Sequence, residues 1–191
     1  MITAIVFDFF GVICSEIAVF WFGERFPDEV AKRMKDECFT LADRGDIDEE
    51  EVFKRLSAIS GDDPKEIERD FYSRAIINKD TVALIERLKE NNRVSLLSNA
   101  MANFLHRILR ENDLYRLFET MVISGEEHVI KPEPEIFELL LSRMGVSAGE
   151  AVFIDDNPKN VAAARAIGMH AILFETAEGV ARELRDLGVN I

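Results

Sequence analysis

The spacing of apolar residues changes along this chain and predicts two kinds of element. The run Ile5-Val6-Phe7 is continuous, β-branched and aromatic, which is typical of a strand buried on both faces. Between residues 15 and 77 the apolar residues recur three or four positions apart with charges between them, as in Glu50-Glu51-Val52-Phe53-Lys54-Arg55-Leu56. The pattern therefore predicts one early strand followed by a long helical segment.

From residue 80 onward, helical and strand-like segments alternate to the end of the chain. Helices are expected at residues 81–89, 104–110, 134–144, 159–167 and 178–187, and strands at residues 94–97, 121–123, 151–154 and 170–174. Such apolar strands, alternating with helices, indicate a parallel sheet with helices on both faces. We therefore predict an α/β fold, a Rossmann-like, doubly wound parallel sheet built from residues 1–14 and 78–191, with an inserted helical cap at residues 15–77.

Composition and charge narrow the classes of partner. The 191 residues suit one core with a small appendage, and 48% hydrophobic with 31% charged residues is typical of a folded chain. The net charge of −13 argues against a broad nucleic-acid surface. Because no apolar stretch approaches the roughly 18 residues of a membrane span and no signal segment is recognisable, we expect no membrane partner and a cytoplasmic location. In that compartment Cys14 and Cys38 are expected to be free thiols.

Carboxylates follow two of the expected strands. Asp8 ends the first apolar run, and Asp155 and Asp156 follow the run at residues 151–154. The carboxyl ends of parallel strands meet at one edge of a sheet, so the three acids are expected to converge there. Three carboxylates at one place favour a hard divalent cation such as Mg²⁺, and an exposed Asp8 is also available as a nucleophile.

Further polar residues at the same edge suit phosphate chemistry. Ser98 and Asn99 end the strand that begins near Val94, and Lys131 lies in a later loop. Ser98 can donate a hydrogen bond to a phosphoryl oxygen, and Lys131 can neutralise charge on that group. Each residue also has an ordinary structural explanation, as a helix cap, a strand end or a solvated loop lysine. The order of the segments along the chain, more than any single residue, indicates phosphate chemistry.

These segments resemble the four motifs of the haloacid dehalogenase-like hydrolase superfamily, and the resemblance covers essentially the whole chain. The matching stretches are, in order, Asp8-Phe9-Phe10-Gly11-Val12, Leu96-Leu97-Ser98-Asn99, Lys131-Pro132 and Asp155-Asp156-Asn157-Pro158-Lys159-Asn160. The family places a four-helix cap directly after the first motif, where the helical segment lies here. The resemblance implies a hydrolase with an α/β core and a cap.

The resemblance also implies roles for individual residues. Asp8 would be the nucleophile, and Asp8, the Phe10 carbonyl oxygen and Asp156 would bind Mg²⁺, with Asp155 acting directly or through water. A phosphoryl group would be held by Ser98 and Lys131. Asn99 and Gly11 would contact the substrate.

One position departs from the phosphatases of the family. They usually carry a second Asp two residues after the nucleophile as general acid and base, where this chain has Phe10. A phenyl ring transfers no proton, and general acid–base catalysis typically contributes about 10²–10⁴-fold in rate. A subset similar to sugar-phosphate phosphatases also lacks this Asp yet keeps an acidic fourth motif. The resemblance therefore implies a Mg²⁺-dependent phosphatase that forms an aspartyl phosphate on a small phosphomonoester, with sugar phosphates among the candidates.

Two other functions stay open at this stage. The dehalogenase branch of the family has an aromatic residue at the position of Phe10, but it usually has Thr where this chain has Val12, and it lacks the acidic pair. A phosphometabolite-binding protein with little turnover is the second alternative, because Phe10 replaces the acid–base residue. The physiological substrate, the cap residues that set specificity and the oligomeric state are not determined by these patterns.

Overall fold

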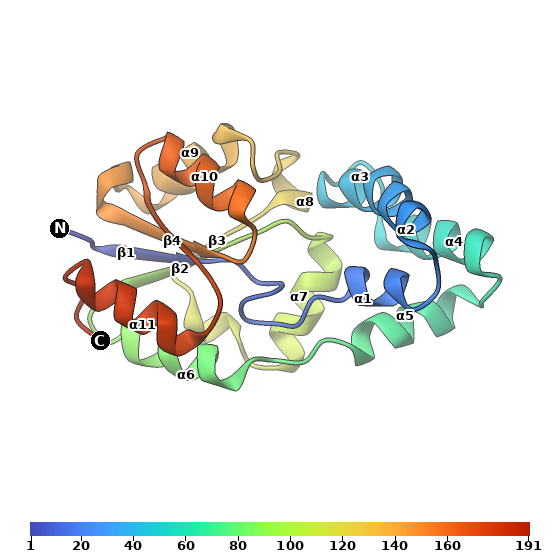
Figure 1. The fold of residues 1–191 in the computed structure, drawn as a ribbon, viewed down its shortest axis with the longest axis horizontal. Helices are drawn as coiled ribbons and strands as arrows, with labels where there is room; N and C mark the ends of the chain where they lie inside the picture. The colour runs from blue at the N-terminus through green and yellow to red at the C-terminus, as the bar shows by residue number, and fades with distance from the viewer.

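A five-stranded parallel sheet forms the centre of the protein (Figure 1). The computed structural model describes residues 1–191, except for the side chain of Asp36. The strands follow the order β3-β2-β1-β4-β5, and each neighbouring pair is parallel. Their bounds are Ala4–Phe7 (β1), Arg93–Ser98 (β2), Thr120–Ile123 (β3), Ala151–Asp155 (β4) and His170–Leu173 (β5). The predicted parallel sheet is confirmed.

Helices cover both faces of the sheet. They are α6 (Lys79–Leu88), α7 (Ala102–Glu111), α9 (Pro134–Met144), α10 (Pro158–Ala166) and α11 (Ala177–Asp186), with the short elements η2 (Tyr115–Leu117), α8 (Ser124–Glu127) and η3 (Ala148–Glu150). Successive side chains of a strand point to opposite faces. In β1, Ile5 and Phe7 pack in the cluster that contains α6, α7 and α11, whereas Ala4 and Val6 pack in the cluster that contains α9 and α10. The sheet is therefore doubly wound, as predicted.

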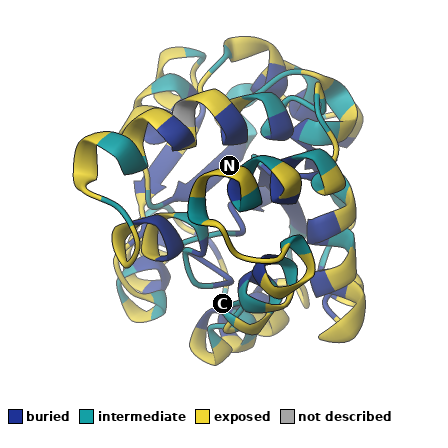
Figure 2. Cartoon of the chain, turned by 90° about the vertical axis from the view of Figure 1, so that its right-hand side faces the viewer, coloured by how far each residue is buried: buried dark blue, intermediate teal, exposed yellow. Residues whose placement is uncertain are grey.

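The segment between β1 and α6 is helical. It contains α1 (Ala18–Gly23), α2 (Asp28–Met34), the π-helical turn η1 (Lys35–Phe39), α3 (Thr40–Asp43), α4 (Glu49–Ser60) and α5 (Pro64–Ser73). Figure 1 shows these helices grouped at one end of the molecule, opposite both termini. Their apolar faces, which include Trp21, Phe53 and Phe71, belong to the same cluster as one face of the sheet. Figure 2 shows this end of the molecule, where exposed positions alternate along the helices with buried ones.

The two connections between the inserted helices and the sheet run side by side. Ser15 N–H donates to the Ile76 carbonyl at 2.9 Å, and Ser15 Oγ donates to the Arg74 carbonyl at 2.6 Å. Asn78 N–H donates to the Ile13 carbonyl at 2.8 Å. These bonds fix the start of the insertion against its end, directly beside the loop that follows β1.

The expectations about cysteines and membrane spans can also be compared with the structure. Cys14 and Cys38 are both buried and free, as predicted. Among the described residues, no helix is both long enough and apolar enough to cross a membrane.

Asn78 is expected to contribute measurably to stability. Its side chain caps α6 by accepting from the N–H groups of Asp80 and Thr81, and it donates to the Val12 carbonyl at 3.4 Å. Replacing an N-cap Asn by Ala typically costs about 1 kcal/mol. We expect Asn78→Ala to lower the free energy of unfolding by about that amount in urea denaturation. The exposed Lys79→Ala variant is the control, expected to stay within roughly 0.5 kcal/mol, and equal stabilities for the two variants would contradict this role.

Candidate active site

A buried lysine joins two carboxylates at the carboxyl ends of β1 and β4. Lys131 Nζ lies 2.7 Å from Asp8 Oδ1 and 2.7 Å from Asp155 Oδ2, and it donates to the Leu97 carbonyl at 3.2 Å. All three side chains are nearly inaccessible, with exposures of 4% for Lys131, 7% for Asp8 and 0% for Asp155. Buried charges need such pairing. β1 and β4 flank the point where the strand order reverses, which is where parallel α/β sheets bind ligands.

The two adjacent acids after β4 occupy different environments. Asp155 accepts from the Asn157 N–H at 2.7 Å, from the Asn160 amide at 3.1 and 3.0 Å, and from Lys131. Its carboxylate therefore holds the lysine and the start of α10. Asp156 is only partly buried and lines a cavity together with Asp8.

The three carboxylates do converge, as the parallel strand order predicted. Asp8, Asp155 and Asp156 each offer an oxygen, and these atoms all lie within 4.8 Å of one another. Oxygen ligands at this spacing suit a hard cation such as Mg²⁺.

Gly11 makes room for one of these acids. A Cβ atom at Gly11 would lie 2.2 Å from Asp156 Oδ2, and the residue has a φ of +79°, which favours glycine. Gly11 does not belong to the residues that line the cavity. The structure thus explains Gly11 by the space that the Asp156 side chain needs. The family resemblance had implied a contact with the substrate instead.

Ser98 and Asn99 lie at the end of β2, next to Lys131. The Asn99 side chain donates to the Lys131 carbonyl at 2.9 Å and accepts from the Lys131 N–H at 2.8 Å, so it fixes the lysine backbone. Ser98 is fully buried and is not among the residues that line the cavity, and its Oγ has no hydrogen-bond partner among the described residues. An unsatisfied buried hydroxyl is costly, and a bound acceptor would relieve that cost.

Phe10 forms part of the cavity wall. Its ring stacks on Phe104 with centroids 6.3 Å apart and an interplanar angle of 28°, and it meets Phe9 edge to face at 5.0 Å. The side chain at this position therefore supplies packing. Metal binding by the Phe10 carbonyl oxygen stays a prediction.

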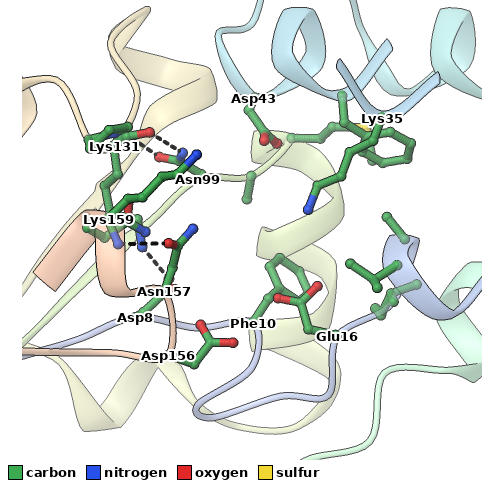
Figure 3. A pocket seen from close by; sticks show the side chains of 18 of the residues that line it. Asp8, Phe10, Glu16, Lys35, Asp43, Asn99, Lys131, Asp156, Asn157 and Lys159 are labelled. Carbon is green, nitrogen blue, oxygen red and sulfur yellow. Dashed lines mark hydrogen bonds and ion pairs between the residues drawn. The ribbon is translucent and has the colours of Figure 1, made fainter. Parts of the chain in front are cut away.

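The cavity lies between the strand ends and the inserted helices and has a volume of about 580 Å³ (Figure 3). Besides Asp8, Asn99, Lys131 and Asp156, it is lined by three charged residues that the sequence did not indicate, Glu16, Lys35 and Asp43. Figure 3 shows these three on the side of the cavity opposite Lys131. In the sequence they resemble ordinary solvated positions of a helical segment.

His128, three residues before Lys131, does not take part in the cavity. Its Nδ1–H donates to the Arg44 carbonyl at 2.8 Å. The residue is exposed and is not among those that line the cavity.

Burial and charge shift the protonation of the cavity residues. Burial raises the pKa of Asp8 well above its ordinary value, against the opposing charge of Lys131. Burial also opposes the charge of Lys131, but Asp8 and Asp155 outweigh it and raise the lysine pKa. The pKa of Asp156 is raised by burial and by Asp155. A bound cation would reverse this trend for the acids, because it favours their ionised forms.

Two of the remaining carboxyls behave similarly. Burial raises the pKa of Glu16, and the charge of Asp156 adds to the shift. Burial raises the pKa of Asp43 to about 7, although Lys35 and Lys131 oppose it. The cavity therefore holds more acidic groups than its own lysines neutralise.

The sequence of this chain is similar to those of known hydrolases and phosphatases. The family model described as haloacid dehalogenase-like hydrolase matches residues 2–168. The chain is 28% identical to a drimenol cyclase of Aspergillus calidoustus, over 76% of this chain but only 29% of that protein. It is also 28% identical to a sesquiterpene phosphatase of Aspergillus oryzae, over 79% of each chain.

Solved structures share the fold. An enzyme of the same family from Bacteroides thetaiotaomicron, crystallised with magnesium and inorganic phosphate, is 25% identical with a TM-score of 0.78, covering 92% of this chain and 95% of that one. A haloacid dehalogenase of Xanthobacter autotrophicus with covalently bound chloropropionic acid is 21% identical with a TM-score of 0.70, covering 100% of this chain and 85% of that one. At that identity the second likeness concerns the fold alone.

The raised pKa of Asp43 predicts a pH-dependent stability. An acid whose pKa rises on folding, here from 3.8 to about 7, binds protons more readily in the folded state, so stability is lost as the pH rises between these values. We expect Asp43→Asn to stabilise the metal-free protein by on the order of 2 kcal/mol near pH 8, the full linkage being reduced by partial solvent screening. Near pH 4 the gain should be small.

Urea denaturation of wild type and variant at about pH 4 and about pH 8 measures this difference. The exposed Asp46→Asn variant, three residues away, is the control. A gain for Asp43→Asn that did not change with pH would be incompatible with the burial of an ionisable Asp43.

Proposed function

Because this chain belongs to the haloacid dehalogenase-like hydrolases, we propose that it is a Mg²⁺-dependent phosphatase that cleaves a phosphomonoester through an aspartyl phosphate on Asp8. The observation that carries the proposal is the convergence of Asp8, Asp155 and Asp156 within 4.8 Å, beside the buried Lys131. One lysine does not balance three carboxylates, so a divalent cation fits this donor set. The magnesium and phosphate bound by the Bacteroides thetaiotaomicron enzyme support the same conclusion.

The two oxygens of Asp8 are not equivalent. Oδ1 accepts from the Phe9 N–H at 2.7 Å and contacts Lys131, whereas Oδ2 takes part in neither interaction. In the proposed mechanism Oδ2 attacks phosphorus, and the bond to the leaving oxygen breaks, with the alkoxide taking a proton from water. A second water then hydrolyses the acyl phosphate, which regenerates the Asp8 carboxylate and releases phosphate. Mg²⁺ held by Asp8, Asp156 and the Phe10 carbonyl would screen the repulsion between carboxylate and phosphate.

Ser98 and Lys131 are assigned to the phosphoryl group. The Ser98 hydroxyl is free to donate to a phosphoryl oxygen, because it has no partner among the described residues. Lys131 supplies positive charge where negative charge develops in the transition state. Asn99 acts indirectly, since its two hydrogen bonds hold the lysine backbone.

Residues 15–77 are proposed to act as a cap over a catalytic core of residues 1–14 and 78–191. Support comes from contacts at the end of α3. The Arg44 guanidinium pairs with Glu133 and donates to the His128 carbonyl at 3.4 Å. These partners flank Lys131 in sequence, so the position of the cap is tied to the phosphoryl-binding loop. A small phosphorylated metabolite enclosed between cap and core is the proposed substrate.

Dehalogenation of a 2-halo acid is the second candidate, and Phe10 is the observation in its favour. The acidic cluster argues for the phosphatase instead, because displacement of halide by a carboxylate needs no metal. A cavity of about 580 Å³ also supports a substrate larger than a small halo acid. A phosphometabolite-binding protein with little turnover would share the same site and differ in rate.

Replacing the nucleophile is the first test. Wild type with Mg²⁺ is expected to release phosphate from phosphomonoesters, whereas Asp8→Asn should lose more than about 10³-fold in kcat because no covalent intermediate can form. EDTA should abolish the wild-type activity. The exposed Asp80→Asn variant serves as the control for charge removal, and thermal melting verifies that each variant folds.

Other outcomes of this experiment separate the alternatives. Equal phosphate release by wild type and Asp8→Asn would exclude the mechanism. Halide release from 2-chloropropionate in EDTA would favour the dehalogenase. Tight binding of phosphate without turnover would favour the binding protein.

The effect of lacking a carboxyl at position 10 can be tested by introducing one there. Phe10→Asp is expected to raise kcat for alkyl phosphates by roughly 10²-fold, because these poor leaving groups need a proton. The gain for p-nitrophenyl phosphate should be much smaller, since its leaving group is stable as an anion. Phe10→Asn, which has nearly the shape and polarity of Phe10→Asp but no ionisable proton, is the matched control. If the two variants were equally active, another residue would have to supply the proton.

A further inference from the structure

Besides Lys159 of α10, three charged side chains that line the cavity have no task in the proposed chemistry. Glu16 lies in the connection between β1 and α1, Lys35 begins η1, and Asp43 ends α3. All three line the cavity. In Figure 3 the ammonium group of Lys35 appears between the carboxyls of Asp43 and Glu16, across the cavity from Lys131.

Aromatic side chains surround these charges. The cavity wall also contains Phe10, Phe39, Phe71 and Phe104. Burial raises the pKa of both Glu16 and Asp43, which means that their ionised forms are disfavoured in the unliganded protein, and Lys35 opposes both shifts. Apolar residues at the two acidic positions would serve folding better. Stability therefore does not explain these charged residues, whereas binding of a polar molecule does.

The backbone that follows Asp43 is held in place by the core. Its neighbour Arg44 pairs with Glu133, and the Arg44 carbonyl accepts from His128. Gly45 has a φ of +75°, and a Cβ atom there would lie 2.4 Å from the Gly125 carbonyl oxygen, so the backbone of the insertion and that of the core are in close contact. A polar group fixed before the ligand arrives loses little entropy on binding.

We propose that Glu16, Lys35 and Asp43 form a polar subsite that recognises the organic group of the phosphorylated substrate. This inference rests on the proposed phosphatase function. The two carboxyls accept hydrogen bonds from hydroxyl or amino groups, and Lys35 donates to an oxygen. The phenyl rings pack against the carbon skeleton between these polar contacts.

The subsite defines a class of substrate. The hydroxyl groups of a hydroxylated phosphomonoester would form hydrogen bonds with the three charged groups. The phosphate of a hydrocarbon alcohol would remove water from these groups without replacing its hydrogen bonds. Sites built to hydrogen-bond a substrate discriminate strongly against analogues that lack the polar group. The preferred substrate is therefore polar along its organic part, in contrast to the terpenoid substrate class that the name of the sesquiterpene phosphatase indicates.

The test compares catalytic efficiency on three kinds of phosphomonoester with Mg²⁺. They are a hydroxylated set (glucose 1-phosphate, ribose 5-phosphate and glycerol 3-phosphate), geranyl phosphate, and p-nitrophenyl phosphate. Wild type is expected to prefer the best hydroxylated ester to geranyl phosphate. Asp43→Ala and Lys35→Met should lower the ratio of kcat/KM for that ester to kcat/KM for p-nitrophenyl phosphate by roughly 10- to 100-fold, mainly through KM.

Matched controls come from the same insertion. Lys32 and Asp46 are exposed and do not line the cavity. Lys32→Met and Asp46→Asn remove the same kinds of charge as the test variants, so any effect of net charge on substrate encounter appears in them too. Both are expected to keep the wild-type ratio.

The outcomes separate the subsite from the reaction. The subsite would be overturned if wild type preferred geranyl phosphate, or if Asp43→Ala and Lys35→Met lost activity equally on all esters. In both cases, turnover that depends on Asp8 would still support the phosphatase function. Absence of turnover on every ester, p-nitrophenyl phosphate included, would remove the phosphatase function and the subsite with it.

Discussion

The buried ion pairs of Lys131 hold the candidate site together. Its ammonium group contacts Asp8 after β1 and Asp155 in β4, while the Asn99 side chain at the end of β2 binds its backbone. Each of these charged groups would be costly at this depth without the others. The three chain segments therefore have to meet in one arrangement. That arrangement leaves Asp156 and Oδ2 of Asp8 outside the lysine contacts, as the proposed binding of a cation and a substrate requires.

The sequence predicted the parts of this arrangement that follow from strand geometry. An apolar run that stops at an acid marks the carboxyl end of a buried strand, and parallel order then brings Asp8, Asp155 and Asp156 to one edge. Strand geometry did not distinguish the two adjacent acids, although the family resemblance gave cation binding to Asp156 and a direct or water-mediated role to Asp155. β4 ends at Asp155, whose side chain lies in the core and holds Lys131, whereas Asp156 follows the strand and lines the cavity. Identical side chains carry no sign of that difference.

The polar subsite could not be predicted from the sequence for a different reason. Glu16 comes from a loop, and Lys35 and Asp43 come from η1 and α3. Their relative placement depends on how the inserted helices pack and on the close contact between Gly45 and Gly125. Long-range packing of this kind leaves no periodic signal, and single charges among helical residues are usually solvated. The helices themselves were predictable, because their apolar spacing is local.

Phe10 connects the chemistry of the site with its specificity. The ring that stands where related phosphatases carry an acid packs on Phe104, and both line the cavity that contains Glu16 and Asp43. A carboxylate at that position would add another negative charge beside Asp8 and Asp156, in a cavity that already has an excess of acids. With an aromatic side chain there, the proposed mechanism leaves the electrostatic part of catalysis to Lys131 and a bound cation, and the ring would contact substrate carbon. If the proposed function holds, such a site favours recognition of an organic group over rapid proton transfer, and its rate would depend on the acidity of the leaving alcohol.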